Sequence, residues 1–495
     1  MADDSFNLTR RQFTLALGGA ISSLPYLNLC GAEPGSGSPA WMGSATVKVI
    51  YLTAKPSWPR PDVDLNQDVA GIEAKLGELT RRYPGQIRFT GGEIVGKAAA
   101  DGRYNWDAAT KELAAVLANS DDADVILAFN MTCYVRPLVV KLAEFGKPTL
   151  LFSVPYAGHD WVTAANYIQR GARFELIASS DFTDLDPYVP LFRTIHHMRH
   201  SKVLLVNPQA THPGAAAYTK AFGTAFGYFG FNDINEAFKA ADVSKAEALA
   251  GEFIRAAVKT IEPTRSEIVD SFRLHLALQD LLCQEKANAI SIDCLGGFGS
   301  GKLPAYPCVS FSRLNDAGMY GVCECDLDST MTQLTVTPFS GRPGFVTDPV
   351  FDTSRNEVIH AHCVSATRLR GINDQPCPYI IRNHLEDHKG VSMQVLAPAG
   401  DPVTVARFAA GPEKMMLSTA ESLGNVDTDR GCRTKVRTKV KDARKLLANW
   451  SAAVNTGPTI PGMTPSLHRV LFYGDHTEEI ERLGRLAGFQ VVHEA

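Results

Sequence analysis

The chain has 495 residues and a formal net charge of −4 at pH 7, with 45% hydrophobic and 21% charged residues. This length exceeds what one hydrophobic core usually supports and predicts about three domains. The composition is typical of a globular protein. The lack of a basic surplus argues against nucleic acid as a partner, and the lack of charge blocks argues against binding at a membrane surface.

The first 44 residues are expected to be an export signal and a flexible lead-in rather than part of the fold. Arg10 and Arg11 precede a moderately apolar run that begins at Thr14, a pattern typical of twin-arginine (Tat) signals. An ordinary basic N-terminus is the alternative. We therefore expect a periplasmic or extracellular protein. No later stretch has the length and apolar character of a transmembrane helix, so we expect no membrane insertion of the mature protein.

Residues 45–200 alternate between short apolar runs and amphipathic periods. The predicted strands are 47–52, 87–89, 125–129 and 149–152, and the predicted helices are 69–83, 106–118 and 135–145. Strands that alternate with helices of this length indicate βαβ units around a parallel sheet. This segment is therefore predicted to be an N-terminal α/β domain.

Residues 201–349 are predicted to form a second, central α/β domain. Its expected strands are 202–206 and 289–293, and its expected helices are 215–226, 245–261 and 266–285. The glycine- and proline-rich run from Gly296 to Pro307 is expected to be a loop. It has the glycine–lysine spacing of a phosphate-binding loop, but Leu303 replaces the hydroxyl residue and Pro304 disfavours the helix that such a loop needs.

After residue 350 the pattern changes to short strands separated by turn residues. These strands are predicted at 379–382, 391–395, 403–408, 415–417 and 433–440, followed by a helix at 477–486 and a strand at 489–492. This spacing is typical of antiparallel barrels. The predicted fold class is thus α/β, with two Rossmann-like α/β domains followed by an antiparallel β-barrel domain over 350–495.

The ten cysteines are expected to be mostly free thiols. Several of them lie in or beside apolar, strand-like runs, where buried thiols are common. Cys323 and Cys325 have the wrong spacing for a zinc knuckle, and an extended run would place both sulfurs on the side opposite Glu324.

Two carboxylates and one distant histidine are the strongest candidates for chemistry. Glu324 belongs to the run Gly321 to Asp326, which is predicted to be extended, and Asp348 follows another apolar run. Together with an imidazole they can hold a divalent cation and leave positions open for substrate oxygens. One carboxylate can then remove a proton from a carbon next to a carbonyl, and the other can return it. Solvated caps at strand ends are the alternative for acidic residues.

A resemblance to a known family gives these residues a specific interpretation. The tail from Ser466 through His468 to Gly474, followed by a helix and a strand, resembles the segment that ends the catalytic barrel of L-fucose isomerase. The interval from Glu324 to Asp348 and the order of the three domains resemble that family as well. The chain resembles L-arabinose isomerase more distantly.

The resemblance implies a metal-dependent aldose–ketose isomerase that acts on a monosaccharide through a cis-enediol. Glu324 and Asp348 would transfer the proton and also bind a manganese-like ion (Mn²⁺ or another divalent cation), and His468 would be the third protein ligand. It also implies a homo-oligomer. Two alternatives remain open: a non-catalytic periplasmic sugar-binding protein, and a metal-dependent epimerase or lyase that acts on a sugar acid.

Other histidines are weaker candidates. His362 is close enough in sequence to Asp348 to line the same pocket and contact substrate, although a core histidine is the alternative. His384 and His388 are expected in a barrel loop near the site, where His384 would contact substrate. The cluster at 196–200 is expected to be a solvated helix end rather than a metal site.

Overall fold

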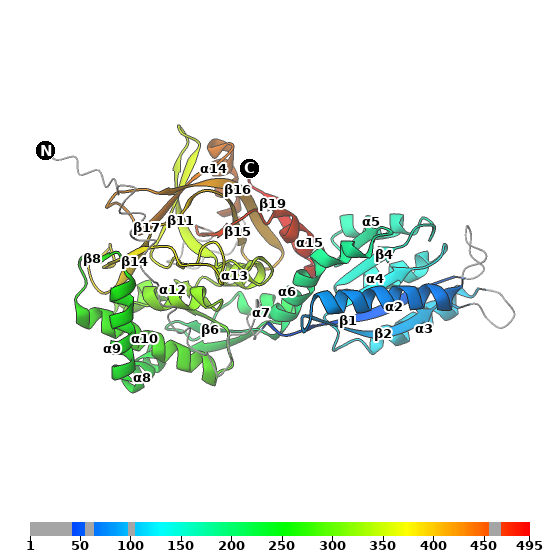
Figure 1. The fold of residues 1–495 in the computed structure, drawn as a ribbon, viewed down its shortest axis with the longest axis horizontal. Coiled ribbons are helices and arrows are strands. Elements are labelled where there is room, and N and C mark those ends of the chain that lie inside the picture. The colour runs from blue at the N-terminus through cyan, green and yellow to red at the C-terminus, as the bar shows by residue number, and fades with distance from the viewer. Residues whose placement is uncertain (1–41, 55–63, 98–103, 455–466) are drawn as a thin grey trace.

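The computed structural model describes residues 42–54, 64–97, 104–454 and 467–495. The twin-arginine motif at Arg10 and Arg11 lies outside these residues. The described chain contains two parallel sheets with helices, a closed antiparallel barrel and a small three-stranded sheet (Figure 1). The prediction of parallel α/β elements followed by an antiparallel barrel is confirmed at this level. Among the helices that the structure describes, none combines the length and apolar character needed to cross a lipid bilayer.

The first sheet has the strand order β2-β1-β3-β4-β5, and all its pairings are parallel. Its strands are β1 (Ala45–Leu52), β2 (Ile87–Val95), β3 (Val125–Asn130), β4 (Thr149–Ser153) and β5 (Phe174–Ala178). Its helices are α2 (Leu65–Arg82), α3 (Trp106–Ala118), α4 (Arg136–Phe145) and α5 (Trp161–Gln169). The inner strands are buried on both faces, which explains their continuous apolar runs.

The second parallel sheet has the order β10-β9-β6-β7. Its strands are β6 (Lys202–Val206), β7 (Ala225–Phe229), β9 (Ala289–Ile292) and β10 (Tyr320–Cys323). It is preceded by the 3-10 helix η3 (Phe182–Tyr188) and helix α6 (Val189–His200). The helices that accompany it are α7 (Ala215–Phe222), α8 (Phe231–Ala240), α9 (Val243–Ala256), α10 (Arg265–Gln284), α11 (Cys294–Gly299), α12 (Cys308–Asp316) and α13 (Leu327–Ser340).

Several local predictions in this region were wrong. The helix expected over 215–226 ends at Phe222, and β7 follows it. The expected loop after Gly296 lies partly in α11. The extended run that contains Glu324 ends at Cys323, because Glu324 and Cys325 both adopt left-handed backbone conformations and Asp326 then caps α13. The presumed alternation of Cys323 and Cys325 is therefore absent.

The barrel is a closed ring in the order β15-β18-β11-β12-β17-β16, with β15 paired back to β16. Its strands are β11 (Phe345–Asp352), β12 (Glu357–His362), β15 (Ala399–Phe408), β16 (Lys414–Asn425), β17 (Thr434–Lys439) and β18 (Arg469–Tyr473). Strand β19 (Gln490–His493) adds to β16 in parallel, and α14 (Ala443–Val454) packs beside β11. The predicted boundary at residue 349 falls inside β11, and the boundary at residue 200 falls between α6 and β6.

Two strands that were expected in the barrel lie elsewhere. β13 (Tyr379–Arg382) and β14 (Ser392–Val395) form a separate three-stranded sheet with β8 (Lys259–Thr260). Their alternation was recognised correctly, but alternation does not tell which sheet a strand joins. The segment that contains His384 and His388 therefore connects two strands of this small sheet instead of two barrel strands.

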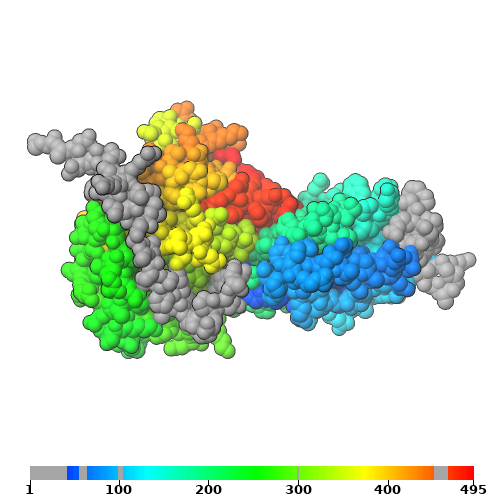
Figure 2. Space-filling model, viewed as in Figure 1, coloured from blue at the N-terminus to red at the C-terminus, as the bar shows by residue number. Residues whose placement is uncertain are grey.

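The first sheet forms one lobe, and the second sheet and the barrel form the other (Figures 1 and 2). Helix α15 (Thr477–Ala487), which follows β18, packs against β5 of the first sheet. There Nε of Arg485 donates to Oε2 of Glu175 at 2.7 Å. The C-terminal part of the chain thus contacts its N-terminal part.

Candidate active site

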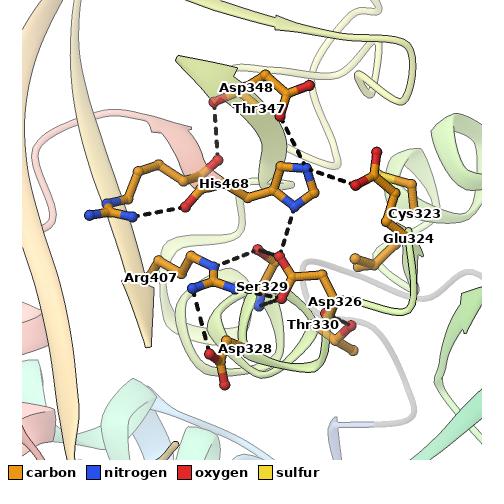
Figure 3. Close-up of polar contacts among 12 residues, drawn as sticks. Cys323, Glu324, Asp326, Asp328, Ser329, Thr330, Thr347, Asp348, Arg407 and His468 are labelled. Carbon is orange, nitrogen blue, oxygen red and sulfur yellow. Dashed lines mark hydrogen bonds and ion pairs between the residues drawn. The ribbon is translucent and has the colours of Figure 1, made fainter. Parts of the chain in front are cut away.

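Glu324, Asp348 and His468 meet at one point (Figure 3). Nε2 of His468 lies 3.4 Å from Oε2 of Glu324 and 3.2 Å from Oδ1 of Asp348. Glu324 follows the last strand of the second parallel sheet, whereas Asp348 and His468 belong to the barrel. The site therefore lies where the parallel sheet meets the barrel.

Strand register explains how Asp348 and His468 come together. In the antiparallel pair of β11 and β18, Phe345 lies opposite Leu471 and Thr347 lies opposite Arg469. The next step in this register brings Asp348 opposite His468, the residue directly before β18. Cross-strand neighbours in an antiparallel pair are close enough for their side chains to interact.

A strained turn positions Glu324. Glu324 has a φ of 61° and Cys325 a φ of 52°, a left-handed conformation that costs non-glycine residues about 1–3 kcal/mol each. The backbone N–H of Cys325 donates to the carbonyl of Ile292 at 3.0 Å, and Nδ2 of Asn207 lies 3.6 Å from its sulfur. These contacts hold the turn, which directs the Glu324 carboxylate toward the barrel.

Asp326 lies on the other side of the His468 ring. Its Oδ2 is 2.8 Å from Nδ1 of His468, and its Oδ1 accepts the Ser329 backbone N–H at 3.0 Å as the N-cap of α13. Nη2 of Arg407, on β15, donates to Oδ1 of Asp326 at 2.8 Å. Asp326 thereby fixes the imidazole plane and leaves Nε2 directed at Glu324 and Asp348, the arrangement that protein metal sites commonly use to orient a histidine ligand.

Sequence reasoning did not assign a role to Asp326. The signal that was available is the aspartate itself, which is a favoured N-cap residue and stands directly before the helix. The N-cap role of Asp326 could be recognised only after helix α13 had been identified. Arg407 carried no local signal, because its partners Asp326 and Asp328 are distant in sequence.

The two carboxylates are in the protonation state that a cation requires, whereas His468 must first lose a proton. Burial acts to raise the pKa values of Glu324 and Asp348, but the nearby imidazoles outweigh it and hold both pKa values below their ordinary range. Burial acts to lower the pKa of His468, but hydrogen bonds to Asp326 and Asp348 raise it to about 9. The site therefore holds ionised carboxylates around a protonated imidazole. A divalent cation at Nε2 would replace that proton.

His362 lies at the same cluster, as predicted from its sequence position. Its Nδ1 accepts the backbone N–H of Cys363 at 2.9 Å, so Nε2 carries the hydrogen in the neutral ring. Nε2 lies 3.5 Å from Oε1 of Glu324 and 3.9 Å from Oδ2 of Asp348. In this tautomer His362 is a hydrogen-bond donor toward the carboxylates.

The carboxylates are the accessible part of the cluster. The side chains of Glu324 and Asp348 are 27% and 35% exposed, whereas those of His362 and His468 are 4% and 7% exposed. The imidazoles thus lie behind the carboxylates, and a small molecule can approach from the carboxylate side.

The remaining predicted histidines lie elsewhere. The structure places His384 beside Cys308 and Cys363, with donor atoms within 4.8 Å of one another. In α6, Nδ1 of His196 lies 2.8 Å from Oδ2 of Asp124, and a guanidinium nitrogen of Arg199 lies 3.5 Å from Oδ1. This guanidinium already supplies positive charge, which disfavours a cation there.

The expectation that the histidines of α6 are all solvated was wrong for His197. This side chain is buried, and its Nε2 lies 3.0 Å from the hydroxyl of Tyr320. His197 packs into the core from the inner face of α6, whereas His200 is exposed.

A scan against family models and a search of curated proteins each found no match for this chain. Function is therefore inferred from the geometry of the site.

Proposed function

We propose that this protein is a metal-dependent aldose–ketose isomerase that acts on a monosaccharide through a cis-enediol. One observation carries the proposal: two partly exposed carboxylates, Glu324 and Asp348, converge on the buried Nε2 of His468. The resemblance of the surrounding segments to L-fucose isomerase supports the same assignment and suggests fucose- or arabinose-like sugars.

The donor set fits a hard-to-borderline divalent cation such as Mn²⁺. Nε2 of His468 lies 3.4 Å from Oε2 of Glu324 and 3.2 Å from Oδ1 of Asp348, so these three side chains face one point. Two carboxylate oxygens and one imidazole nitrogen would hold the ion, and the accessible side would stay open to substrate. When bound, such an ion polarises a carbonyl and stabilises negative charge on adjacent oxygens.

The side chains of this chain supply the proton transfer. Glu324 and Asp348 are ionised at neutral pH, so either carboxylate can accept the proton from the carbon next to the substrate carbonyl. The carboxylic acid formed can return that proton to the neighbouring carbon, while the hydroxyl proton moves from one substrate oxygen to the other. His362 is oriented to donate a hydrogen bond from Nε2 toward the same space. Asp326 keeps the His468 ring in place during this exchange.

The test is proton exchange in deuterated water. We expect purified protein with added Mn²⁺ to convert at least one member of a panel of aldoses and deoxy-aldoses to the ketose, with deuterium at C1 or C2. An epimer or a dehydrated sugar acid as product would replace the isomerase assignment with an epimerase or a lyase. Saturable sugar binding without exchange would indicate a binding protein.

The proposal includes two further expectations from the sequence. The Tat-type N-terminus suggests export to the periplasm or beyond, and the family resemblance suggests a homo-oligomer. Fractionation of the producing cells and sedimentation of the purified protein test these two points separately.

A further inference from the structure

A second group of metal-ligating side chains lies beside the carboxylate site. Cys308 is the first residue of α12, Cys363 directly follows β12, and His384 lies between β13 and β14. All three side chains are buried, and their donor atoms lie within 4.8 Å of one another. The sulfurs of Cys308 and Cys363 are 3.3 Å apart. Three elements that are distant in sequence thus bring two thiols and one imidazole together.

We propose that Cys308, Cys363 and His384 form a binding site for a thiophilic cation of the zinc class. Two sulfurs and one nitrogen are the donors that Zn²⁺ prefers, whereas the carboxylate site offers mainly oxygen. The two sites therefore select different ions. This inference does not depend on the isomerase proposal.

The separation of the sulfurs favours a shared ion over a disulfide. Two thiolates on one tetrahedral zinc, each about 2.3 Å from the metal, lie about 3.8 Å apart. The sulfurs of a disulfide are about 2.05 Å apart. The observed 3.3 Å is nearer to the first arrangement. Burial also keeps both thiols away from soluble oxidants.

Two neighbouring side chains, Tyr306 and Asp387, restrict the orientation of His384. The ring of Tyr306 stacks on the imidazole with a centroid distance of 5.0 Å and an interplanar angle of 26°. Oδ1 of Asp387 lies 3.8 Å from Nδ1 of His384, and the hydroxyl of Tyr306 donates to Oδ2 of Asp387. A carboxylate next to the imidazole and a ring on its face restrict the orientation of a ligand histidine.

His362 connects the two sites. Its Nδ1 lies 3.4 Å from the sulfur of Cys363, and its Nε2 lies 3.5 Å from Oε1 of Glu324. An ion that fixes Cys363 would therefore also restrict the imidazole that faces the carboxylates. The thiol site is thus placed to stabilise the geometry of the carboxylate site.

The test uses the reduced, full-length protein and Co²⁺ as a spectroscopic substitute for zinc. Thiolate ligands give cobalt an intense near-ultraviolet charge-transfer band, which oxygen and nitrogen ligands do not. We expect this band to saturate at one Co²⁺ per chain and to disappear when Zn²⁺ is added. Cys308→Ser and Cys363→Ser should lose the band, and His384→Gln should weaken Co²⁺ binding by about tenfold or more.

Two control variants separate this site from other possibilities. Cys133→Ser removes a buried thiol from the first lobe, and Glu324→Gln alters the carboxylate site; both should keep the band. Loss of the band in Glu324→Gln would overturn the claim of separate sites. Retention of the band in folded Cys363→Ser would overturn the assignment itself.

A measurement on the wild-type chain covers the case in which the cysteine variants do not fold. In a urea concentration that lets reagent reach buried thiols, Zn²⁺ should protect Cys308 and Cys363 from alkylation, as mapped by mass spectrometry, and should leave the reactivity of Cys133 unchanged. Equal alkylation of Cys308 and Cys363 with and without Zn²⁺ would overturn the proposal. So would a Cys308–Cys363 disulfide in protein that binds no zinc after reduction.

Discussion

Oδ2 of Asp326 lies 2.8 Å from Nδ1 of His468, and both side chains are buried. This contact links the N-cap of α13 to the histidine directly before β18. The position of His468 in the barrel therefore depends on a helix that belongs to the parallel-sheet part of the fold.

Replacement of Asp326 by Asn should weaken divalent-cation binding, and the protein should still fold because Arg407 keeps a second buried carboxylate, Asp328, at 3.5 Å. Asn is also a favourable N-cap, so α13 keeps its start, but the neutral amide no longer holds His468 as a carboxylate does. Loss of such an orienting partner typically costs about 10–100-fold in metal affinity. Titration with Mn²⁺ measures the change. Ser354→Ala, a change at an exposed turn, is the control and should leave the affinity unchanged.

Replacement of Glu324 by Gln should abolish isotope exchange without unfolding the protein. The side chain is partly exposed, so the neutral amide is tolerated, but it cannot accept the proton from substrate. We expect a decrease in exchange rate of about 10²-fold or more. Glu478→Gln, which removes an exposed carboxylate paired with Arg482, is the matched control. Wild-type exchange rates in Glu324→Gln would exclude Glu324 as the base.

Replacement of Arg407 by Ala should strongly destabilise the protein. Arg407 is buried and pairs with Asp326 at 2.8 Å and Asp328 at 3.5 Å, so its removal leaves buried carboxylates without compensation. The expected loss is about 3–5 kcal/mol in the free energy of unfolding. Arg370→Ala, which breaks the more exposed pair with Asp401, should cost about 1 kcal/mol or less. Urea unfolding of both variants tests the difference.

Stability should fall as the pH is lowered from about 6 to about 4. Burial lowers the pKa values of His197, His275 and His360 to about 3, so these imidazoles stay neutral in the folded protein and become protonated on unfolding. The unfolded state then binds more protons, and each histidine removes up to about 1.4 kcal/mol of stability per pH unit.

The contribution of one such histidine can be isolated. His275→Asn can retain a hydrogen bond to Ser310 but cannot be protonated. When the free energy of unfolding is plotted against pH, the slope for this variant should be smaller than that of the wild type by the equivalent of about one bound proton. An unchanged slope would mean that His275 is not neutral in the folded protein.

The strands of the fold were largely predictable from the sequence, because inner parallel strands such as β1 and β3 appear as continuous apolar runs. Helix α13 was missed for a physical reason. It is buried on nearly all sides, so it has no amphipathic period, and it is rich in threonine. The buried hydroxyls of Thr330 and Thr335 donate hydrogen bonds to backbone carbonyls one turn earlier in the helix. Sequence patterns do not reveal such bonds.

The site was predictable only in part. Glu324, Asp348 and His468 were identified through a family resemblance, and the structure brings them together. The cluster of Cys308, Cys363 and His384 could not be found in this way, because its members come from three elements without a short spacing motif. The pairing of β13 with β8 instead of the barrel sets the position of His384.

Glu324 and His468 come from the two architectures that meet at the site. A shared ion would therefore cross-link the end of β10 to the mouth of the barrel. By mass action, such a cross-link would make separation of the two parts less favourable as the ion concentration rises. The ion would then bind only while the barrel and the parallel sheet are in contact.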